Sequence, residues 1–175
     1  MSRGDVGRRL LGLLRAGLRS AAPTTGTRRP AAPARRPAAP ARPPRVGPDD
    51  EIGYRPRADG AADPGEVVWA WVPYEEDDGR GKDRPVLVIG RRATTLLALM
   101  LTSKDHDRDA ADEARFGRIW TDVGSGDWDA RRRPSEVRLD RLLVLDPAHV
   151  RREGAALDRE RFDRVVGEAR RVQGW

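Results

Sequence analysis

The sequence predicts a mainly β (α+β) domain: a small barrel with a C-terminal covering helix, preceded by a disordered tail rich in proline, alanine and arginine. Three observations predict it. Residues 24–48 are dense in proline and offer few apolar side chains for a core. From Gly65 onward, short segments are apolar on both faces, as in a sheet that wraps around its core and is covered outside. The helical pattern of the folded part comes last.

The N-terminal part divides into two predicted segments. Residues 1–20 form a basic amphipathic segment, in which one helical face carries Leu10, Leu11, Leu14 and Leu18. Such a segment could contact an anionic membrane surface, nucleic acid or a groove on a partner protein; a frayed tail without a role is the alternative. Arginines interrupt its apolar stretch, which is not typical of a secretory signal. Residues 21–64 are predicted to be a disordered linker that leads to the folded domain, residues 65–175.

The charge of the chain is distributed unevenly. Residues 1–48 carry 11 arginines and one acidic residue, whereas residues 49–175 carry 23 basic and 27 acidic residues. The net charge of +6 therefore divides into +10 for the tail and −4 for the remainder. A nucleic-acid function of the folded part must rest on a local site and not on its bulk charge.

Composition excludes some classes of protein. The chain has no cysteine, which excludes disulfides and thiolate zinc sites and fits a cytoplasmic location. It has no run of about 18 apolar residues that could span a membrane.

The elements of the folded part follow one another in a simple order. Five strands are expected, at residues 66–73, 85–90, 95–102, 117–123 and 135–145, of which the last is the longest. A charged, glycine-bearing loop, residues 74–84, separates the first two strands. The final helix has Asp158 as a candidate N-cap and an apolar face at Phe162, Val165, Val166 and Ala169.

Four short motifs occur along this domain. They are GEVVW at 65–69, KDRPVLVI at 82–89, LTS at 101–103 and SEVRLDRLLVLD at 135–146. Their order and spacing over residues 65–172 resemble the PemK/MazF toxins of type II toxin–antitoxin systems. The resemblance implies an SH3-like barrel, a homodimer and neutralisation by a cognate antitoxin. It also implies cleavage of single-stranded RNA without a metal ion or other cofactor.

The resemblance also implies which residues act on RNA. Arg84 and Thr102 match the catalytic pair of the MazF branch, and Arg138 and Asp140 match the Arg-x-Asp pair of the Kid/PemK branch. The loop histidine used by some Kid-like members has no counterpart in residues 74–83. Which branch's chemistry applies stays open.

The chemistry of these residue types agrees with that assignment. Cleavage by the 2′-hydroxyl needs a proton acceptor, a donor for the leaving oxygen and positive charge on the phosphorane. Arg84 could clamp the phosphate, because Pro85 favours extended backbone before it; an ion pair with Asp83 or Glu75 is the alternative. The Thr102 hydroxyl could donate to a phosphate oxygen or merely form a turn.

Arg138 and Asp140 lie two residues apart on one predicted strand, which places them on the same face. They could act as electrophile and base, or they could form a structural ion pair. Both interpretations are kept.

Further residues are candidates for contact with the RNA. They are Lys82, Ser103, Trp128, Arg131, Arg132 and Arg133. The three consecutive arginines could follow the RNA backbone, dock an acidic antitoxin segment or be a solvated loop. Trp128 lies in a loop between two aspartates and could stack on a base, whereas Trp69, Trp71 and Trp120 are expected in the core.

Two other features of the sequence give little support to a function. His106 could titrate in a proton transfer but is better explained as a solvated loop histidine. The acidic run from Asp105 to Asp109 begins like a calcium loop, yet Ala110 and Phe116 stand where an EF-hand has glycine and glutamate. No metal site is expected.

A second class of function competes with the nuclease: a non-catalytic SH3-like module, a degenerate toxin that docks nucleic acid or a protein. The net charge of −4 and the acidic insert after residue 104 favour this alternative. The Arg-Pro and Leu-Thr-Ser motifs favour the enzyme.

Overall fold

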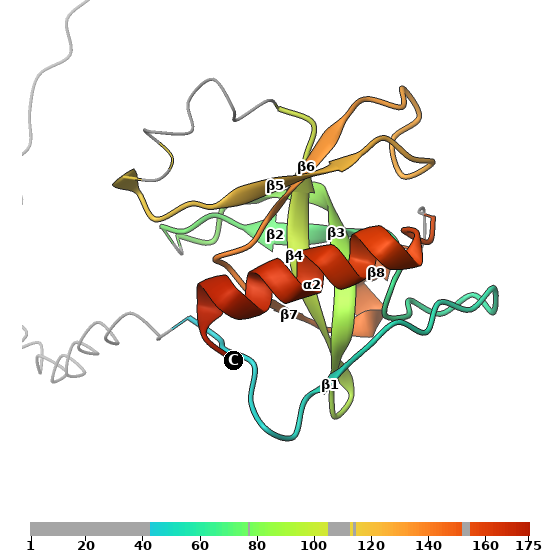
Figure 1. The fold of residues 1–175 in the computed structure, drawn as a ribbon, viewed down its shortest axis with the longest axis horizontal. Helices are drawn as coiled ribbons and strands as arrows, with labels where there is room; N and C mark the ends of the chain where they lie inside the picture. The colour runs from blue at the N-terminus through green and yellow to red at the C-terminus, as the bar shows by residue number, and fades with distance from the viewer. Residues whose placement is uncertain (1–42, 77, 105–112, 114, 152–154) are drawn as a thin grey trace, which may run out of the picture. The chain divides into compact units, whose positions relative to one another are not determined.

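The computed structural model describes residues 43–76, 78–104, 113, 115–151 and 155–175 (Figure 1). The predicted amphipathic segment, the linker up to residue 42 and most of the acidic insert, with His106, lie outside the described residues. Within the described part, no helix is long and apolar enough to cross a membrane.

The predicted mainly β fold with a covering C-terminal helix is confirmed. One antiparallel sheet of eight strands has the order β5-β6-β4-β3-β2-β8, with β1 paired to β3 and β7 paired to β4 (Figure 1). The strands are β1 Glu51–Ile52, β2 Val67–Pro73, β3 Gly81–Arg92, β4 Thr95–Thr102, β5 Trp120–Gly124, β6 Ser135–Arg138, β7 Leu143–Leu145 and β8 Val150–Arg151. The helix α2, Arg159–Gln173, follows them.

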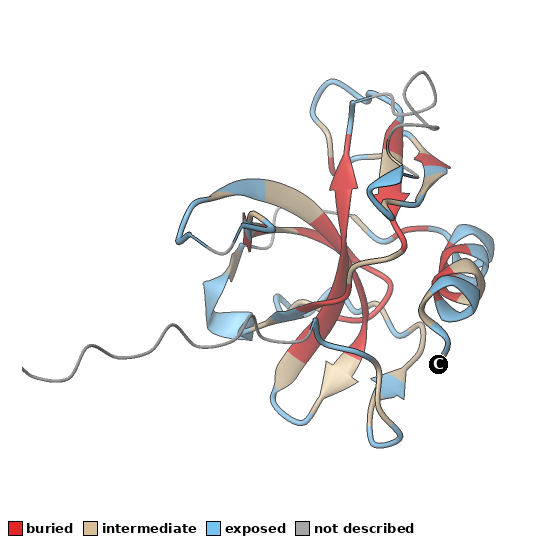
Figure 2. Ribbon diagram, turned by 90° about the vertical axis from the view of Figure 1, so that its left-hand side faces the viewer, coloured by how far each residue is buried: buried red, intermediate tan, exposed pale blue. Residues whose placement is uncertain are grey.

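Both faces of the central strands are buried, as their composition predicts (Figure 2). Val67 on β2 and Leu87 and Ile89 on β3 belong to the cluster that α2 covers. The alternating neighbours Val68 and Val86 belong to a second cluster on the opposite face of the sheet. Alternation of side chains along a strand therefore supplies two cores from one sheet.

The helix α2 has the N-terminal boundary and the apolar face that its sequence predicts. The Asp158 side chain accepts a hydrogen bond from the backbone N–H of Arg161 at 2.9 Å, which caps the first turn. All four residues of the predicted face are buried: Phe162, Val165, Val166 and Ala169. Gly174, with φ of 74°, ends the helix in the left-handed conformation that glycine adopts most easily.

The prediction of one long strand over residues 135–145 is wrong. The chain leaves the sheet after Arg138 and returns as β7, and the two pieces pair with different parts of β4. The break follows from Asp140, whose carboxylate turns back to accept from the N–H of Ile119 at 2.8 Å. The longest strand is instead β3, with 12 residues.

The predicted linker extends too far, because the folded part begins before residue 65. Glu51 and Ile52 pair with β3, and Gly90 permits the approach, since a Cβ there would overlap the Glu51 carbonyl oxygen. Tyr54 packs edge-on against Phe162 with ring centroids 5.2 Å apart. These contacts attach residues 51–54 to the domain.

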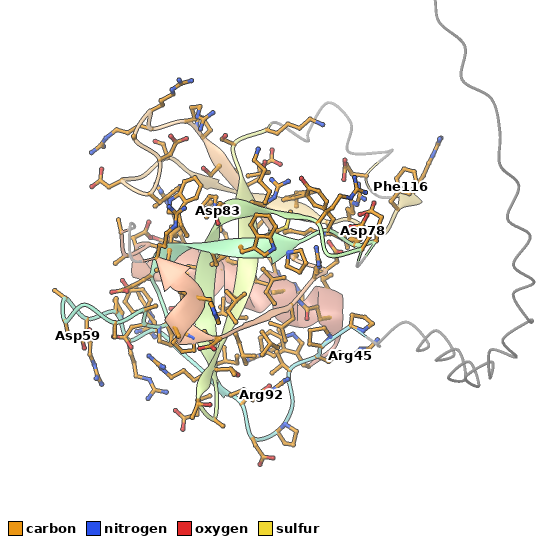
Figure 3. The ribbon with its side chains drawn as sticks, turned by 180° about the vertical axis from the view of Figure 1, so that it is seen from behind. Arg45, Asp59, Asp78, Asp83, Arg92 and Phe116 are labelled. Atoms are coloured by element: carbon orange, nitrogen blue, oxygen red, sulfur yellow. The ribbon has the colours of Figure 1, made fainter. Side chains whose placement is uncertain are left out.

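A further ion pair attaches the segment before β1. Arg92, at the end of β3, donates to the Asp50 carboxylate at 2.7 and 2.8 Å and to the Arg45 carbonyl oxygen at 2.6 Å. Arg45 and Arg92 are labelled in Figure 3. The Asp50 side chain is only 3 % exposed, so the pair is part of the folded structure and not a surface contact.

Candidate active site

The candidate site begins where β3 and β4 separate. The two strands pair from Val86–Met100 onward, and Pro85 has no N–H to continue the ladder. Beyond that point β3 pairs with β2, while the end of β4 pairs with β6 through Leu101 and Thr102. Arg84 and Thr102 therefore lie on the two diverging strand ends.

Two clefts, each of about 500 Å³, adjoin this separation. Arg84 and Thr102 line both of them, together with Lys104. The first cleft also contains Glu75, from the loop between β2 and β3, and Arg138. The two residues that were predicted to form the catalytic centre are thus brought together at the boundary between two hollows.

The first cleft is positively charged although the domain is not. It is lined by six basic side chains: Arg80, Arg84, Lys104, Arg118, Arg138 and Arg141. Three acidic side chains oppose them: Glu75, Glu76 and Glu113. The local site that a nucleic-acid function requires of this domain is present here.

Arg84 has no ion pair among the residues that the structure describes. The alternative partners that the sequence offered are engaged elsewhere: Asp83 pairs with Arg151 at 2.8 Å, and Glu75 pairs with Arg138 and Arg118. The contacts of Asp83 and Glu75 therefore speak against the alternative interpretation, in which Arg84 is an ordinary strand-edge arginine paired with one of them. The charge of Arg84 is available to a ligand.

Thr102 is 9 % exposed and ends β4. Its hydroxyl oxygen accepts a hydrogen bond from the backbone N–H of Lys104 at 3.1 Å, which fixes the turn that follows the strand. The hydroxyl hydrogen is not bonded to any described residue and can be donated. The turn-forming interpretation and the donor interpretation are compatible, since they use different atoms of one hydroxyl.

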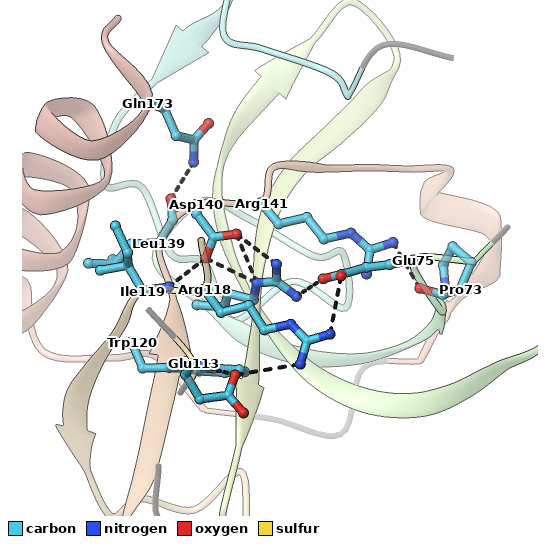
Figure 4. A network of polar contacts seen from close by, with 11 residues as sticks. Pro73, Glu75, Glu113, Arg118, Ile119, Trp120, Leu139, Asp140, Arg141 and Gln173 are labelled. Carbon is cyan, nitrogen blue, oxygen red and sulfur yellow. Dashed lines mark hydrogen bonds and ion pairs between the residues drawn. The ribbon is translucent and has the colours of Figure 1, made fainter. Parts of the chain in front are cut away.

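Arg138 and Asp140 form a close ion pair (Figure 4). Nε of Arg138 lies 3.0 and 3.1 Å from the two Asp140 oxygens, and Nη2 lies 2.7 Å from Oδ2. The Asp140 carboxylate lines neither cleft, and it also accepts a hydrogen bond from the backbone N–H of Ile119. Of the two interpretations left open, these contacts support the structural pair.

Glu75 is a second carboxylate in contact with Arg138, and it also contacts Arg118 (Figure 4). Burial lowers the pKa of Arg138, but the hydrogen bonds and charges of Asp140 and Glu75 outweigh burial and raise it. Burial raises the pKa of Glu75, but the hydrogen bonds and charges of Arg138 and Arg118 outweigh burial and hold that pKa below its ordinary value. Arg138 and Glu75 are therefore both charged at neutral pH.

Comparison with known proteins shows the family of this chain. The family model of PemK-like, MazF-like toxins of type II toxin–antitoxin systems matches residues 63–172. The chain belongs to this toxin family. Among solved structures, a MazE–MazF complex from Deinococcus radiodurans is similar with 19% identity and a TM-score of 0.43, over 66% of this chain and 98% of that chain. No curated protein sequence matches.

Four of the toxin's six predicted RNA-contacting residues line the second cleft. Lys82, Ser103, Trp128 and Arg133 do so, whereas Arg131 and Arg132 line neither cleft. Arg132 pairs with Asp127, and Arg133 donates to Asp129 at 2.7 Å. The hydrogen bond from Arg133 lowers the pKa of the Asp129 carboxyl. The three arginines of the toxin therefore do not form one free basic track.

The prediction that Trp128 stacks on a base is wrong. Although Trp128 borders the second cleft, its side chain is only 4 % exposed and lies in the core, with the ring over Gly126, where a Cβ would overlap it. Its Nε1 donates to Ser135 Oγ at 3.2 Å. Conversely Trp71, expected in the core, is 54 % exposed, while Trp69 and Trp120 are partly buried.

Several charged residues of the toxin's first cleft were not predicted as site residues, among them Glu75, Lys104 and Arg118. Glu75 is one of four consecutive acidic residues, and nothing in that run singles it out. Lys104 directly follows the Leu-Thr-Ser motif, and its charge next to that motif was a usable signal. Arg118 falls within the strand predicted over residues 117–123, where nothing marks it as a site residue, and only the fold brings it to the cleft.

Proposed function

We propose that this toxin is an endoribonuclease that cuts single-stranded RNA without a metal ion, by attack of the 2′-hydroxyl on the adjacent phosphorus. The observation that carries the proposal is Arg84, which has no ion pair with a described residue, beside the Thr102 hydroxyl at the boundary of two clefts. Membership of a toxin family whose members are endoribonucleases supports it.

Each group has a defined task in this reaction. The 2′-hydroxyl loses its proton to solvent water as its oxygen bonds to phosphorus, the bond to the 5′-oxygen breaks, and that oxygen takes a proton from water, so the products end in a cyclic phosphate and a 5′-hydroxyl. The Arg84 guanidinium balances the charge that accumulates on the phosphorane oxygens, and it remains protonated throughout. Thr102 donates its hydroxyl hydrogen to one of these oxygens. Arg138 contributes charge at the cleft wall, held in place by Asp140.

A cognate antitoxin protein is the proposed regulator. The family belongs to type II toxin–antitoxin systems, and a solved MazE–MazF complex is among the similar structures. The positive first cleft would accept an acidic segment of such a partner, which would exclude RNA. We further propose that the toxin acts as a homodimer in the cytoplasm.

One experiment tests the activity. The full chain, its Arg84→Ala variant and a control, Arg171→Ala, would be incubated with single-stranded RNA in EDTA. Arg171 is exposed on α2 and gives the same change of charge outside both clefts. The wild type and the control should leave cyclic phosphate and 5′-hydroxyl ends, with Arg84→Ala about 10² to 10³-fold slower.

The alternative function predicts a different result. A non-catalytic binding module would leave the RNA intact in all three samples while still binding it in a gel-shift or anisotropy measurement. That outcome would exclude the nuclease function and would leave the fold and the family unchanged.

A further inference from the structure

The Glu75 carboxylate is held between two arginines from different parts of the chain. Nη1 of Arg138, on β6, contacts Oε1 of Glu75, and Nη2 of Arg118, before β5, lies 3.3 Å from Oε2 (Figure 4). Each carboxylate oxygen thus has its own guanidinium. Two non-bridging oxygens of a phosphodiester present the same pair of acceptors with the same single negative charge.

The three carboxylates around these arginines differ in exposure. The Asp140 and Glu113 side chains are 17% and 15% exposed, whereas Glu75 is 38% exposed. Asp140 also accepts from the Ile119 N–H, and so cannot leave without breaking a backbone contact. Glu75 comes from the loop between β2 and β3 and is the carboxylate that a ligand in the cleft would meet.

The contact with Glu75 also balances the buried charge of Arg138 in the protein without RNA. The Arg138 side chain is only 8 % exposed, and a buried cation that loses its partner is costly. A phosphodiester that replaces Glu75 would keep that charge balanced, while removal of Glu75 without replacement would not. Exchange of one monoanion for another is therefore the change that this site tolerates best.

We propose that Arg118 and Arg138 form a second phosphate-binding site for the RNA, and that Glu75 occupies it as an internal competitor until RNA displaces it. The inference rests on the proposed action on RNA, since Arg84 and Thr102 line the same cleft. A phosphodiester that flanks the scissile one binds between the two arginines. Only the fraction of molecules with Glu75 displaced is competent, and apparent affinity is reduced by that fraction.

The test uses the full chain and a single-stranded RNA oligonucleotide with 2′-O-methyl groups on every ribose, which 2′-hydroxyl attack cannot cleave. Glu75→Gln keeps the shape but competes less, because neutral hydrogen bonds are about half as strong as charge-assisted ones. It should bind this RNA about tenfold more tightly than the wild type. Glu76→Gln is the matched control: it removes one negative charge from the same cleft at a residue that contacts neither arginine, and should change affinity less than about threefold.

Three outcomes would overturn the inference. One is a Glu75→Gln affinity no higher than that of Glu76→Gln; another is the absence of RNA binding by either variant. The third is tighter binding of a hexaglutamate peptide by Glu75→Gln without tighter binding of RNA, which would make the site a dock for an acidic protein segment. The double variant Glu75→Gln/Arg118→Gln should lose most of the gain, and far-UV circular dichroism would verify that each variant folds.

The nuclease proposal can fail separately. If the wild type does not cleave unmodified RNA but Glu75→Gln still binds the methylated oligonucleotide more tightly, the phosphate site stands and the nuclease does not. If the wild type cleaves unmodified RNA but Glu75→Gln does not bind the methylated oligonucleotide more tightly, the nuclease stands and the phosphate site does not.

Discussion

At the scale of single residues, the arginines of the first cleft differ in how much of their charge is already used. Arg138 contacts two carboxylates and Arg118 contacts two, whereas Arg84 pairs with none among the described residues. A neutralised guanidinium positions groups, but it attracts a phosphorane weakly. Arg84 is therefore the residue of this cleft best suited to the transition state.

The hydroxyl of Thr102 has its own expected effect. Thr102→Val keeps the shape of the side chain but removes the donor, and the Lys104 N–H loses its acceptor. Single-turnover cleavage should slow by about 10 to 100-fold, while Thr102→Ser should retain most of the rate. Equal rates for all three proteins would exclude a contact between this hydroxyl and the reacting phosphate.

Asp140 separates the two interpretations of the Arg138 pair. Asp140→Asn removes the carboxylate that holds the buried guanidinium and should lower the free energy of unfolding by about 3 kcal/mol in urea titrations. Because the pair acts through position, cleavage should fall only moderately where the variant is folded. A variant with unchanged stability and abolished cleavage would instead identify Asp140 as the proton acceptor.

At the scale of elements, periodic segments were predictable and contact-dependent ones were not. The strand over residues 95–102 matches its predicted bounds and the helix begins after Asp158 as predicted, because each has a regular pattern and a clear start. The segment 135–145 also looked continuous, since every position suits a strand. Only the contact of Asp140 with Ile119 shows where the chain leaves the sheet.

The candidate site was predictable to a similar extent. Arg84 and Thr102 were found because each stands in a recognisable motif next to a strand end. The partners of Arg138 and the burial of Trp128 depend on which loops meet in space, and local sequence carries no information on that. Trp128 illustrates the limit: two flanking aspartates suggested solvent, yet its ring fills the core.

The attachment of the segment before β1 gives an expected pH dependence. The hydrogen bonds from Arg92 lower the pKa of Asp50 below its ordinary 3.8, so the folded state favours the carboxylate. The stabilisation is complete above the unfolded pKa and is lost as pH falls through the folded one. Asp50→Asn should thus cost about 2 kcal/mol near pH 7, and the difference from wild type should shrink below about pH 4.

Chemical denaturation between pH 2.5 and 7 measures this difference. Arg92→Gln is the matched control, because it removes the same ion pair from the other side and should cost a similar amount at neutral pH. A cost that does not vary with pH would show that the Asp50 charge has no part in holding the segment.

At the scale of the whole molecule, positive charge occurs in two places that composition cannot separate. Residues 1–42 carry ten arginines and one acidic residue, while the first cleft gathers six basic side chains within a domain of net negative charge. The cleft's charges come from well-separated segments of the chain, so no charge run reveals them. Bulk electrostatics and site electrostatics are therefore expected to act on different properties of RNA binding.

Removal of residues 1–42 tests that separation. Arg84, Thr102 and the residues of both clefts lie within 43–175, so the truncated chain should cleave an RNA of about eight nucleotides as fast as the full chain. For RNA of several hundred nucleotides, the full chain should bind more tightly, with a steeper dependence of log Kd on log salt, because additional arginines displace counterions. Rates on the short RNA and salt titrations on the long one measure the two effects independently. A truncated chain that folds yet cleaves the short RNA much more slowly would place part of the active site in the first 42 residues, and charge in the cleft alone would no longer account for the reaction.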